Sequence, residues 1–135
     1  MRILIADDDK MLLDCFQRWL PRFHVDVVGT AANGLDLVDL YRRNADQVDL
    51  VLTDYNMPRM SGLEAATRIL AIDPRAVVVL MSGYELNESA IHHTGIRALL
   101  KKSDSVESMI RSLFSALTEE QEGLCPTEPG TANGL

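Results

Sequence analysis

Acidic, hydroxyl and ammonium side chains follow four of the apolar segments of this chain. They belong to Asp7, Asp8, Asp9, Asp54, Ser82 and Lys101. Oxygen ligands from carboxylates suit Mg²⁺, and an ammonium group compensates the charge that remains on clustered acids. If these side chains meet in one crevice, they can hold a divalent cation and transfer a phosphoryl group to a carboxylate.

Asp54 is the candidate nucleophile of this group. A carboxylate near its ordinary pKa is ionised at neutral pH, so the reaction needs no histidine as a general base. Mg²⁺ would bridge the carboxylate to the incoming phosphoryl oxygens, while Lys101 and Ser82 would stabilise charge on the others. Asp9 adjoins a predicted helix and is expected to act mainly as its N-cap.

Five short runs rich in Val, Ile and Leu predict the strands that position these groups. They cover residues 2–6, 25–29, 48–53, 76–81 and 98–100. None alternates between apolar and polar residues as a half-exposed strand does, so both faces of the sheet are expected to be covered by helices.

Helical patterns occupy the segments between and after the strands. The residues that form the buried stripes of the five expected helices are Leu12, Phe16, Trp19 and Leu20; Leu37, Val38 and Tyr41; Leu63, Ala66, Thr67 and Leu70; Leu86, Ala90 and Ile91; and Val106, Met109, Ile110, Leu113 and Leu117. Ser61 and Glu64 predict a capping box for the third helix, and Asp104 or Ser105 is the expected cap of the fifth.

Alternating strands and helices predict an α/β fold with a doubly wound, five-stranded parallel sheet. Ligands of such sheets bind beyond the carboxyl ends of the strands, where the polar side chains lie. From about Thr118 the sequence becomes acidic and loses its apolar period. Residues 118–135 are therefore expected to form a disordered tail or linker.

Composition limits the partners of the domain. A net charge of -7 opposes nonspecific binding to nucleic acid or to anionic membranes. The longest apolar run, residues 76–81, is far shorter than the roughly 20 residues of a membrane-spanning helix. No secretory signal is apparent, so a cytoplasmic location is expected, and the two cysteines are expected to be free thiols.

Four segments in order resemble the receiver domain of two-component response regulators. They read ILIADDD at residues 3–9, LTDYNMPRMSGLE at 52–64, LMSG at 80–83 and LLK at 99–101. The resemblance covers about residues 1–117 and implies a (βα)5 flavodoxin-like fold. Each segment alone is a weak signal, but the set in this order is specific.

The resemblance implies roles for individual residues in metal binding. Asp54 matches the phosphoacceptor, Asp8 the direct Mg²⁺ ligand and Asp7 the acid that holds a metal-bound water. Asn56 matches the position whose backbone carbonyl completes the metal site.

Other positions match residues that handle the phosphoryl group. Ser82 matches a hydroxyl that switches on phosphorylation, Gly83 a small residue that gives access, and Lys101 the lysine that pairs with the phosphoryl group. A sensor histidine kinase or phosphotransfer protein would supply the phosphoryl group, and an output domain or effector protein would receive the signal.

Two positions depart from the family pattern. Ala98 stands where the family commonly has Phe or Tyr, and Lys102 stands where proline commonly follows the lysine. Lys102 is expected to be solvated. The first departure questions the usual aromatic movement on phosphorylation, and the second disfavours a cis peptide bond after Lys101.

Two other functions remain open from the residues. A phosphatase of the haloacid-dehalogenase type also uses an aspartate nucleophile and Mg²⁺, but it has a second acid where this chain has Asn56. A pseudo-receiver would bind proteins without being phosphorylated. Release of a small-molecule product would indicate the first function, and an absence of metal binding would indicate the second.

Overall fold

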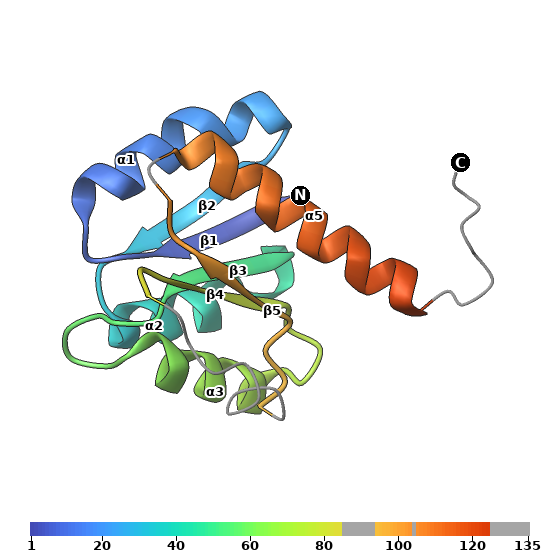
Figure 1. The fold of residues 1–135 in the computed structure, drawn as a ribbon. Helices are drawn as coiled ribbons and strands as arrows, with labels where there is room; N and C mark the ends of the chain where they lie inside the picture. The colour runs from blue at the N-terminus through green and yellow to red at the C-terminus, as the bar shows by residue number, and fades with distance from the viewer. Residues whose placement is uncertain (85–93, 104, 125–135) are drawn as a thin grey trace.

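A computed structural model describes residues 1–84, 94–103 and 105–124, with side chains as far as Thr118. Its centre is a sheet of five parallel strands in the order β2-β1-β3-β4-β5 (Figure 1). The strands are β1 (Arg2–Ala6), β2 (Asp26–Ala31), β3 (Leu50–Asp54), β4 (Val78–Ser82) and β5 (Ala98–Lys101). This confirms the predicted α/β fold with a doubly wound sheet.

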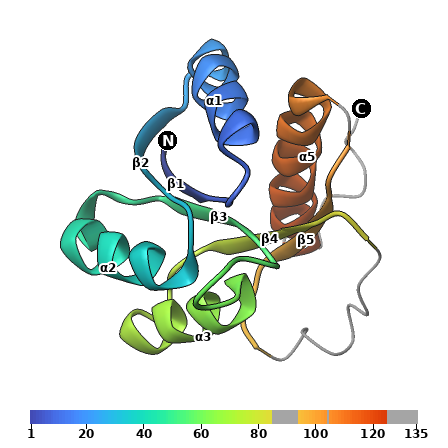
Figure 2. The same cartoon turned by 90° about the vertical axis from the view of Figure 1, so that its left-hand side faces the viewer.

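Helices cover both faces of the sheet, as the uninterrupted apolar strands require. The helices are α1 (Lys10–Trp19), α2 (Gly34–Asn44), α3 (Gly62–Ile72) and α5 (Val106–Leu124), with short 3-10 turns at Leu20–Phe23 and Ala45–Gln47. Figure 2 shows α1 and α5 on one face and α2 and α3 on the other. The fourth predicted helix, around residues 86–91, lies outside the described residues.

Two apolar cores lie on the two faces of the sheet. The first joins alternate strand residues such as Ile3 and Leu52 to Phe16 of α1 and Ile110 of α5. The second joins the remaining strand residues, such as Leu4 and Val51, to α2 and α3. This separation follows from the alternation of side chains along a strand.

Side-chain caps begin the helices at the predicted places. Asp9 Oδ1 accepts hydrogen bonds from the backbone N–H groups of Met11 (3.0 Å) and Leu12 (3.3 Å), so its role as an N-cap is confirmed. Ser61 Oγ likewise accepts from the N–H of Glu64 at 3.1 Å. These caps fix the entry into α1 and α3, the two helices that follow Asp8 and the loop after Asp54.

The packing of α3 differs in detail from the prediction. Its buried residues are Gly62, Ala65, Ala66 and Ile69, whereas Thr67 of the expected stripe is exposed. Small residues at the start of the helix allow it to approach the sheet more closely than a leucine stripe would. The buried face of the helix is therefore rotated from the predicted one.

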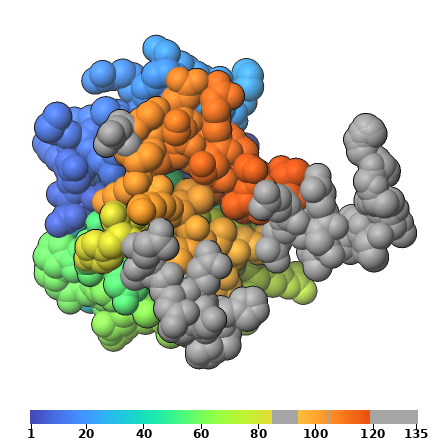
Figure 3. Space-filling view, viewed as in Figure 1, coloured from blue at the N-terminus to red at the C-terminus, as the bar shows by residue number. Residues whose placement is uncertain are grey.

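Several elements end later than the apolar pattern predicts. The strands β2 to β5 each continue one or two residues beyond the expected end. Backbone hydrogen bonding does not stop where side chains become polar, which an apolar run cannot show. Residues 118–124 of the expected disordered tail instead continue α5 to Leu124, because Glu and Gln are good helix formers. The rest of the expected tail lies outside the described residues. The orange helix α5 spans the face of the domain seen in Figure 3.

Within the described ranges, no helix is both long enough and apolar enough to cross a membrane.

Candidate functional site

Three carboxylates meet at the carboxyl ends of β1 and β3. The pairing of Ala6 with Thr53 places Asp7 and Asp54 next to each other at the end of the sheet. A carboxylate oxygen from each of Asp7, Asp8 and Asp54 lies within 4.8 Å of the other two. The predicted cluster is therefore present, with Asp7 and Asp54 buried and Asp8 exposed.

Asp7 is the most enclosed of these acids. Its Oδ1 atom accepts a hydrogen bond from the N–H of Asp9 at 2.9 Å. Its Oδ2 atom is buried without a well-aligned hydrogen bond, although the ammonium of Lys102 lies 2.7 Å away. A buried carboxylate needs compensation, so this oxygen is suited to a cation or to a water held by one.

Lys102, rather than Lys101, supplies the ammonium of the cluster. Its Nζ atom lies 2.7 Å from Asp7 Oδ2 and 3.3 Å from Asp54 Oδ1. The side chain is only 23% exposed, which corrects the expectation that Lys102 is solvated. Lys101 is the last residue of β5 and is exposed.

The alternation of side chains along β5 explains this assignment. Ala98 and Leu100 face the core shared with α1 and α5, and two residues further Lys102 has the same parity. Ile3, Ile5, Leu50 and Leu52 belong to that core too, and Asp7 and Asp54 continue their two series. Lys101 therefore has the opposite parity to the two acids.

The sequence contains this alternation. A strand that ends at Leu100 predicts Lys101 as the first residue beyond it, whereas β5 includes Lys101. With Lys102 as the lysine of the family pattern, Leu99 rather than Ala98 stands where the family commonly has Phe or Tyr. Ser103 rather than Lys102 stands where proline commonly follows the lysine. The two departures from the family pattern therefore lie at Leu99 and Ser103.

Burial and charge set the protonation of the site in opposite directions. Burial, with the neighbouring charge of Asp7, raises the pKa of Asp54, although Lys102 and hydrogen bonding by the Asn56 backbone partly oppose this. Burial lowers the pKa of Lys102, but the attraction of its ammonium to the adjacent carboxylates of Asp7 and Asp54 outweighs this effect, so the pKa of Lys102 is raised. The ammonium therefore stays charged and holds the two acids together.

Ser82 ends β4 beside this cluster. The residue is buried, and its Oγ atom accepts a hydrogen bond from the N–H of Tyr84 at 3.2 Å. Its carbonyl accepts from the N–H of Lys102 at 2.7 Å. Ser82 is thus tied through its backbone to the lysine and through its hydroxyl to the segment after β4.

Asn56 lies in the loop that joins β3 to α3. Its side-chain amide donates a hydrogen bond to the hydroxyl of Tyr84, which is itself 57% exposed. This contact links the segments after β3 and β4 across the carboxyl end of the sheet. Sequence reasoning placed Asn56 near the metal site through its backbone and did not predict its side-chain partner.

The glycine of the Ser-Gly pair after Asp54 is required by a close approach. A Cβ atom on Gly62 would lie 1.8 Å from the carbonyl oxygen of Asp54. The N–H of Gly62 also donates to the carbonyl of Tyr55 at 2.8 Å. The first residue of α3 therefore packs directly on the backbone of Asp54, which leaves no room for a larger side chain.

The donor set fits Mg²⁺. The ion prefers oxygen ligands, and Asp7, Asp8 and Asp54 bring three carboxylates together. The Asp7 oxygen that lacks a well-aligned hydrogen bond belongs to the same group. No histidine or cysteine is in the cluster, so the chemistry of the ligands does not favour zinc.

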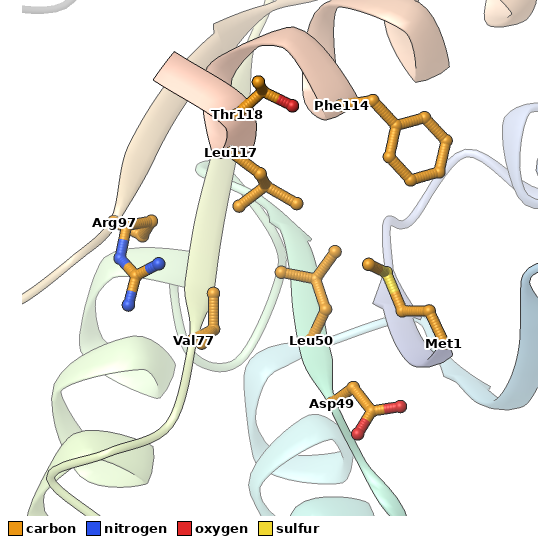
Figure 4. A pocket seen from close by; sticks show the side chains of 8 residues that line it. All are labelled: Met1, Asp49, Leu50, Val77, Arg97, Phe114, Leu117 and Thr118. Atoms are coloured by element: carbon orange, nitrogen blue, oxygen red, sulfur yellow. The ribbon is translucent and has the colours of Figure 1, made fainter. Parts of the chain in front are cut away.

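A separate hollow of about 290 Å³ lies at the other end of the sheet (Figure 4). It is lined by Met1, Asp49, Leu50, Val77, Arg97, Phe114, Leu117 and Thr118. Leu50 is the first residue of β3 and Asp54 is the last, so the length of the strand separates this hollow from the acids. It contributes no group to the candidate site.

Comparisons with known proteins agree with this geometry. The sequence profile of the response regulator receiver domain matches residues 3–113. The chain is 36% identical over 81 residues to the chemotaxis protein CheY of Treponema pallidum, a match covering 60% of this chain and 56% of that protein. It is 28% identical over 127 residues to the transcriptional regulatory protein HptR of Staphylococcus aureus, covering 89% of this chain and 49% of HptR. The chain thus spans about half the length of these curated relatives.

A solved structure supports the fold. A chain of the CheX–CheY–BeF3–Mg complex from Borrelia burgdorferi superposes with a TM-score of 0.80 at 21% identity. The match covers 87% of this chain and 89% of that chain. At that identity the likeness concerns the arrangement of the backbone alone.

Proposed function

This chain belongs to the response regulator receiver domain family, and from that premise we propose that Asp54 is its phosphoacceptor. A receiver domain is a signalling domain of two-component systems that takes up a phosphoryl group in a Mg²⁺-dependent reaction. The proposal concerns which residues of this chain perform each step. Lys102 takes the role that the sequence pattern gave to Lys101.

One observation carries the assignment of Asp54. Its carboxylate is buried at the end of β3, between the acid Asp7 and the ammonium of Lys102. Keeping two buried acids next to each other is costly, and a protein retains such a pair mainly where function uses it. Asp54 also has the loop of Asn56 and the hydroxyl of Ser82 beside its strand end, where a transferred group would lie.

Each residue of the site has a distinct role in the transfer. A carboxylate oxygen of Asp54 attacks phosphorus, and the bond from phosphorus to the donor breaks. Lys102 stabilises negative charge on the transferred group, and the hydroxyl of Ser82 can turn from its Tyr84 contact to donate to a phosphoryl oxygen.

Asp8, Asp7 and the Asn56 backbone would hold Mg²⁺ together with Asp54. A bound Mg²⁺ supplies positive charge that offsets repulsion between the acids and the phosphoryl oxygens. Asp8 is the exposed acid and is proposed as the direct ligand, while Asp7 would hold a bound water. Asp9 does not take part, since its side chain caps α1.

The donor and the recipient of the signal follow from the family. A sensor histidine kinase or phosphotransfer protein is the proposed donor, and an output domain or effector protein is the proposed recipient. One relative is named as a chemotaxis protein and another as a transcriptional regulator, so relatives serve different outputs. The net charge of -7 opposes direct binding of this domain to nucleic acid, and we propose that it acts in the cytoplasm.

We propose that phosphorylation of Asp54 changes the conformation of the domain through Ser82. Movement of its hydroxyl toward the phosphoryl group would break the contact with the N–H of Tyr84 and shift the segment after β4. Tyr84 is already linked to the acceptor side through Asn56. Beryllofluoride should therefore change the backbone chemical shifts of Ser82 and Tyr84, and silence at both residues would contradict this route.

Phosphorylation by a small donor tests the assignment of Asp54. The protein is incubated with acetyl phosphate and Mg²⁺, and the intact mass is measured. The unmodified protein and an Asp46→Asn control, changed at an exposed acid away from the site, should each gain one phosphoryl group. Asp54→Asn should gain none, and a full gain in this variant would overturn the assignment.

Calorimetry with Mg²⁺ separates this function from that of a pseudo-receiver. A protein-binding module without phosphorylation should neither bind Mg²⁺ nor gain mass from acetyl phosphate. A phosphatase of the haloacid-dehalogenase type should instead release product from small phosphate esters in many turnovers. The amide at Asn56 argues against that activity, because it replaces the general acid.

A further inference from the structure

A glycine outside the acceptor motif touches the loop that joins Asp54 to α3. We call residues 55–61 the acceptor loop. Gly34, the first residue of α2, donates a backbone hydrogen bond to the carbonyl of Met60 at 3.1 Å. A Cβ atom on Gly34 would lie 2.4 Å from that carbonyl oxygen and 2.7 Å from Met60 Cβ. The closest atom belongs to the backbone, so a new rotamer of Met60 could not remove the overlap.

The α2 side of this contact is held firmly. Asn33, the buried N-cap of α2, accepts from the N–H of Asp36 at 2.8 Å and donates to the Asp36 carboxylate at 3.1 Å. Ala31, at the end of the preceding strand, accepts from the N–H of Asp7 at 3.0 Å. Gly34 therefore follows closely after Ala31, whose carbonyl is hydrogen-bonded to the backbone of Asp7.

The backbone of the acceptor loop is restrained near Met60, so a displacement of Met60 cannot be taken up there alone. Met60 is buried in the core under α2 and α3, and its N–H donates to the carbonyl of Pro58 at 2.7 Å. Arg59 between them has a φ of 68°, a backbone conformation that is uncommon outside glycine. Proline fixes its own φ, so displacement of Met60 is passed along the loop toward Asn56.

We infer that Gly34 is a positioning residue for the metal site, because its contact with Met60 sets the acceptor loop against the Asp7 end of the sheet. The inference rests on the proposed function, in which the Asn56 backbone helps to hold Mg²⁺. Any side chain at residue 34 pushes the loop away from α2. The Asn56 backbone is then displaced from Asp7 and Asp8, while the acids themselves keep their places.

The test compares Gly34→Ala with a matched glycine substitution. Gly29→Ala serves as the control, because a Cβ atom there would meet only side-chain carbons at 3.4 and 3.5 Å. Both substitutions restrict the unfolded chain similarly. Mg²⁺ affinity is measured by calorimetry without any phosphodonor, and phosphorylation by acetyl phosphate is measured separately.

Gly34→Ala should weaken Mg²⁺ binding about tenfold, in the range found when groups that orient metal ligands are altered, and slow phosphorylation. Gly29→Ala should bind Mg²⁺ like the unmodified protein. A lowered Tm with unchanged Mg²⁺ affinity in Gly34→Ala would overturn the inference and leave only a structural role.

A second variant keeps the inference testable if Gly34→Ala does not fold. Met60→Ala removes the side chain that anchors the acceptor loop without adding an overlap, and it too should weaken Mg²⁺ binding. Unchanged affinity in that variant would overturn the inference. Failure of the proposed function can be distinguished from failure of this inference. If the proposed function is wrong, the protein with the native sequence takes up no phosphoryl group from acetyl phosphate. The inference is instead tested by Mg²⁺ affinity, which is measured without phosphoryl transfer.

Discussion

Replacing Lys102 by methionine should damage both stability and phosphoryl transfer, whereas the same change at Lys101 should not. The Lys102 ammonium lies 2.7 Å from one oxygen of Asp7 and 3.3 Å from one of Asp54. The Asp7 side chain is fully buried, and the Lys102 side chain is 23% exposed. Methionine preserves the length of the side chain and removes only its charge.

The size of the effect follows from this geometry. Removing one partner of a fully buried ion pair costs about 3–5 kcal/mol. Here solvent reaches part of Lys102, and Asp54, whose pKa burial and then the charge of Asp7 raise, can take up a proton in response. We therefore expect a loss of about 2–3 kcal/mol without Mg²⁺. Lys101 is exposed, so Lys101→Met should change stability by no more than about 0.5 kcal/mol.

Urea unfolding at neutral pH, with and without Mg²⁺, measures the stability change. The deficit of Lys102→Met should narrow when Mg²⁺ is added, because the ion offsets the same carboxylate charges. Phosphorylation by acetyl phosphate should slow by about 100-fold, as expected when a group that stabilises transition-state charge is lost. Equal or larger losses in Lys101→Met would refute the assignment of Lys102 and restore the original one.

Three further results are expected. Asp8→Ala should lower Mg²⁺ affinity the most of the single substitutions in the cluster. Asp9→Ala should leave Mg²⁺ affinity unchanged and cost about 1 kcal/mol of stability, because it removes the cap of α1. Equal losses of Mg²⁺ affinity in calorimetry would contradict this ranking. Burial raises the pKa of Tyr41, and the charge of Asp73 and the hydrogen bond to it raise that pKa further. In urea unfolding, the native protein should therefore be more stable than Tyr41→Phe by a constant amount below a pH of about 10, and the difference should shrink as the pH rises further. A difference in stability that grows in alkali would contradict this prediction. Gly62→Ala should lower Tm and slow phosphorylation because its Cβ atom overlaps the Asp54 carbonyl, and a variant with native Tm and rate would show that α3 can move aside.

Much of the fold follows from local rules that the sequence displays directly. The strand at residues 2–6 was predicted to the residue, because Asp7 ends an unbroken apolar run. The cluster of Asp7, Asp8 and Asp54 was predicted because parallel strands bring their carboxyl ends to one edge. The caps at Asp9 and Ser61 were predicted from residue type and spacing.

The errors arise where tertiary structure decides. Two lysines stand in succession at the end of β5, and only the parity of the strand against its core distinguishes Lys102 from Lys101. The rotated face of α3 depends on the close approach of Gly62 to Asp54, which no helical period displays. The contact of Gly34 with Met60 joins residues distant in sequence, so no local pattern in the sequence predicts it.

Locating the phosphoryl group on the chain is the most direct test of the central claim. Protein treated with acetyl phosphate and Mg²⁺ is reduced with borohydride, which converts an aspartyl phosphate to a stable homoserine, and the peptides are then sequenced by mass spectrometry. The account predicts conversion at residue 54 alone, dependent on Mg²⁺. Conversion at Asp7 or Asp8, or none at Asp54 in protein that has gained a phosphoryl group, would contradict it.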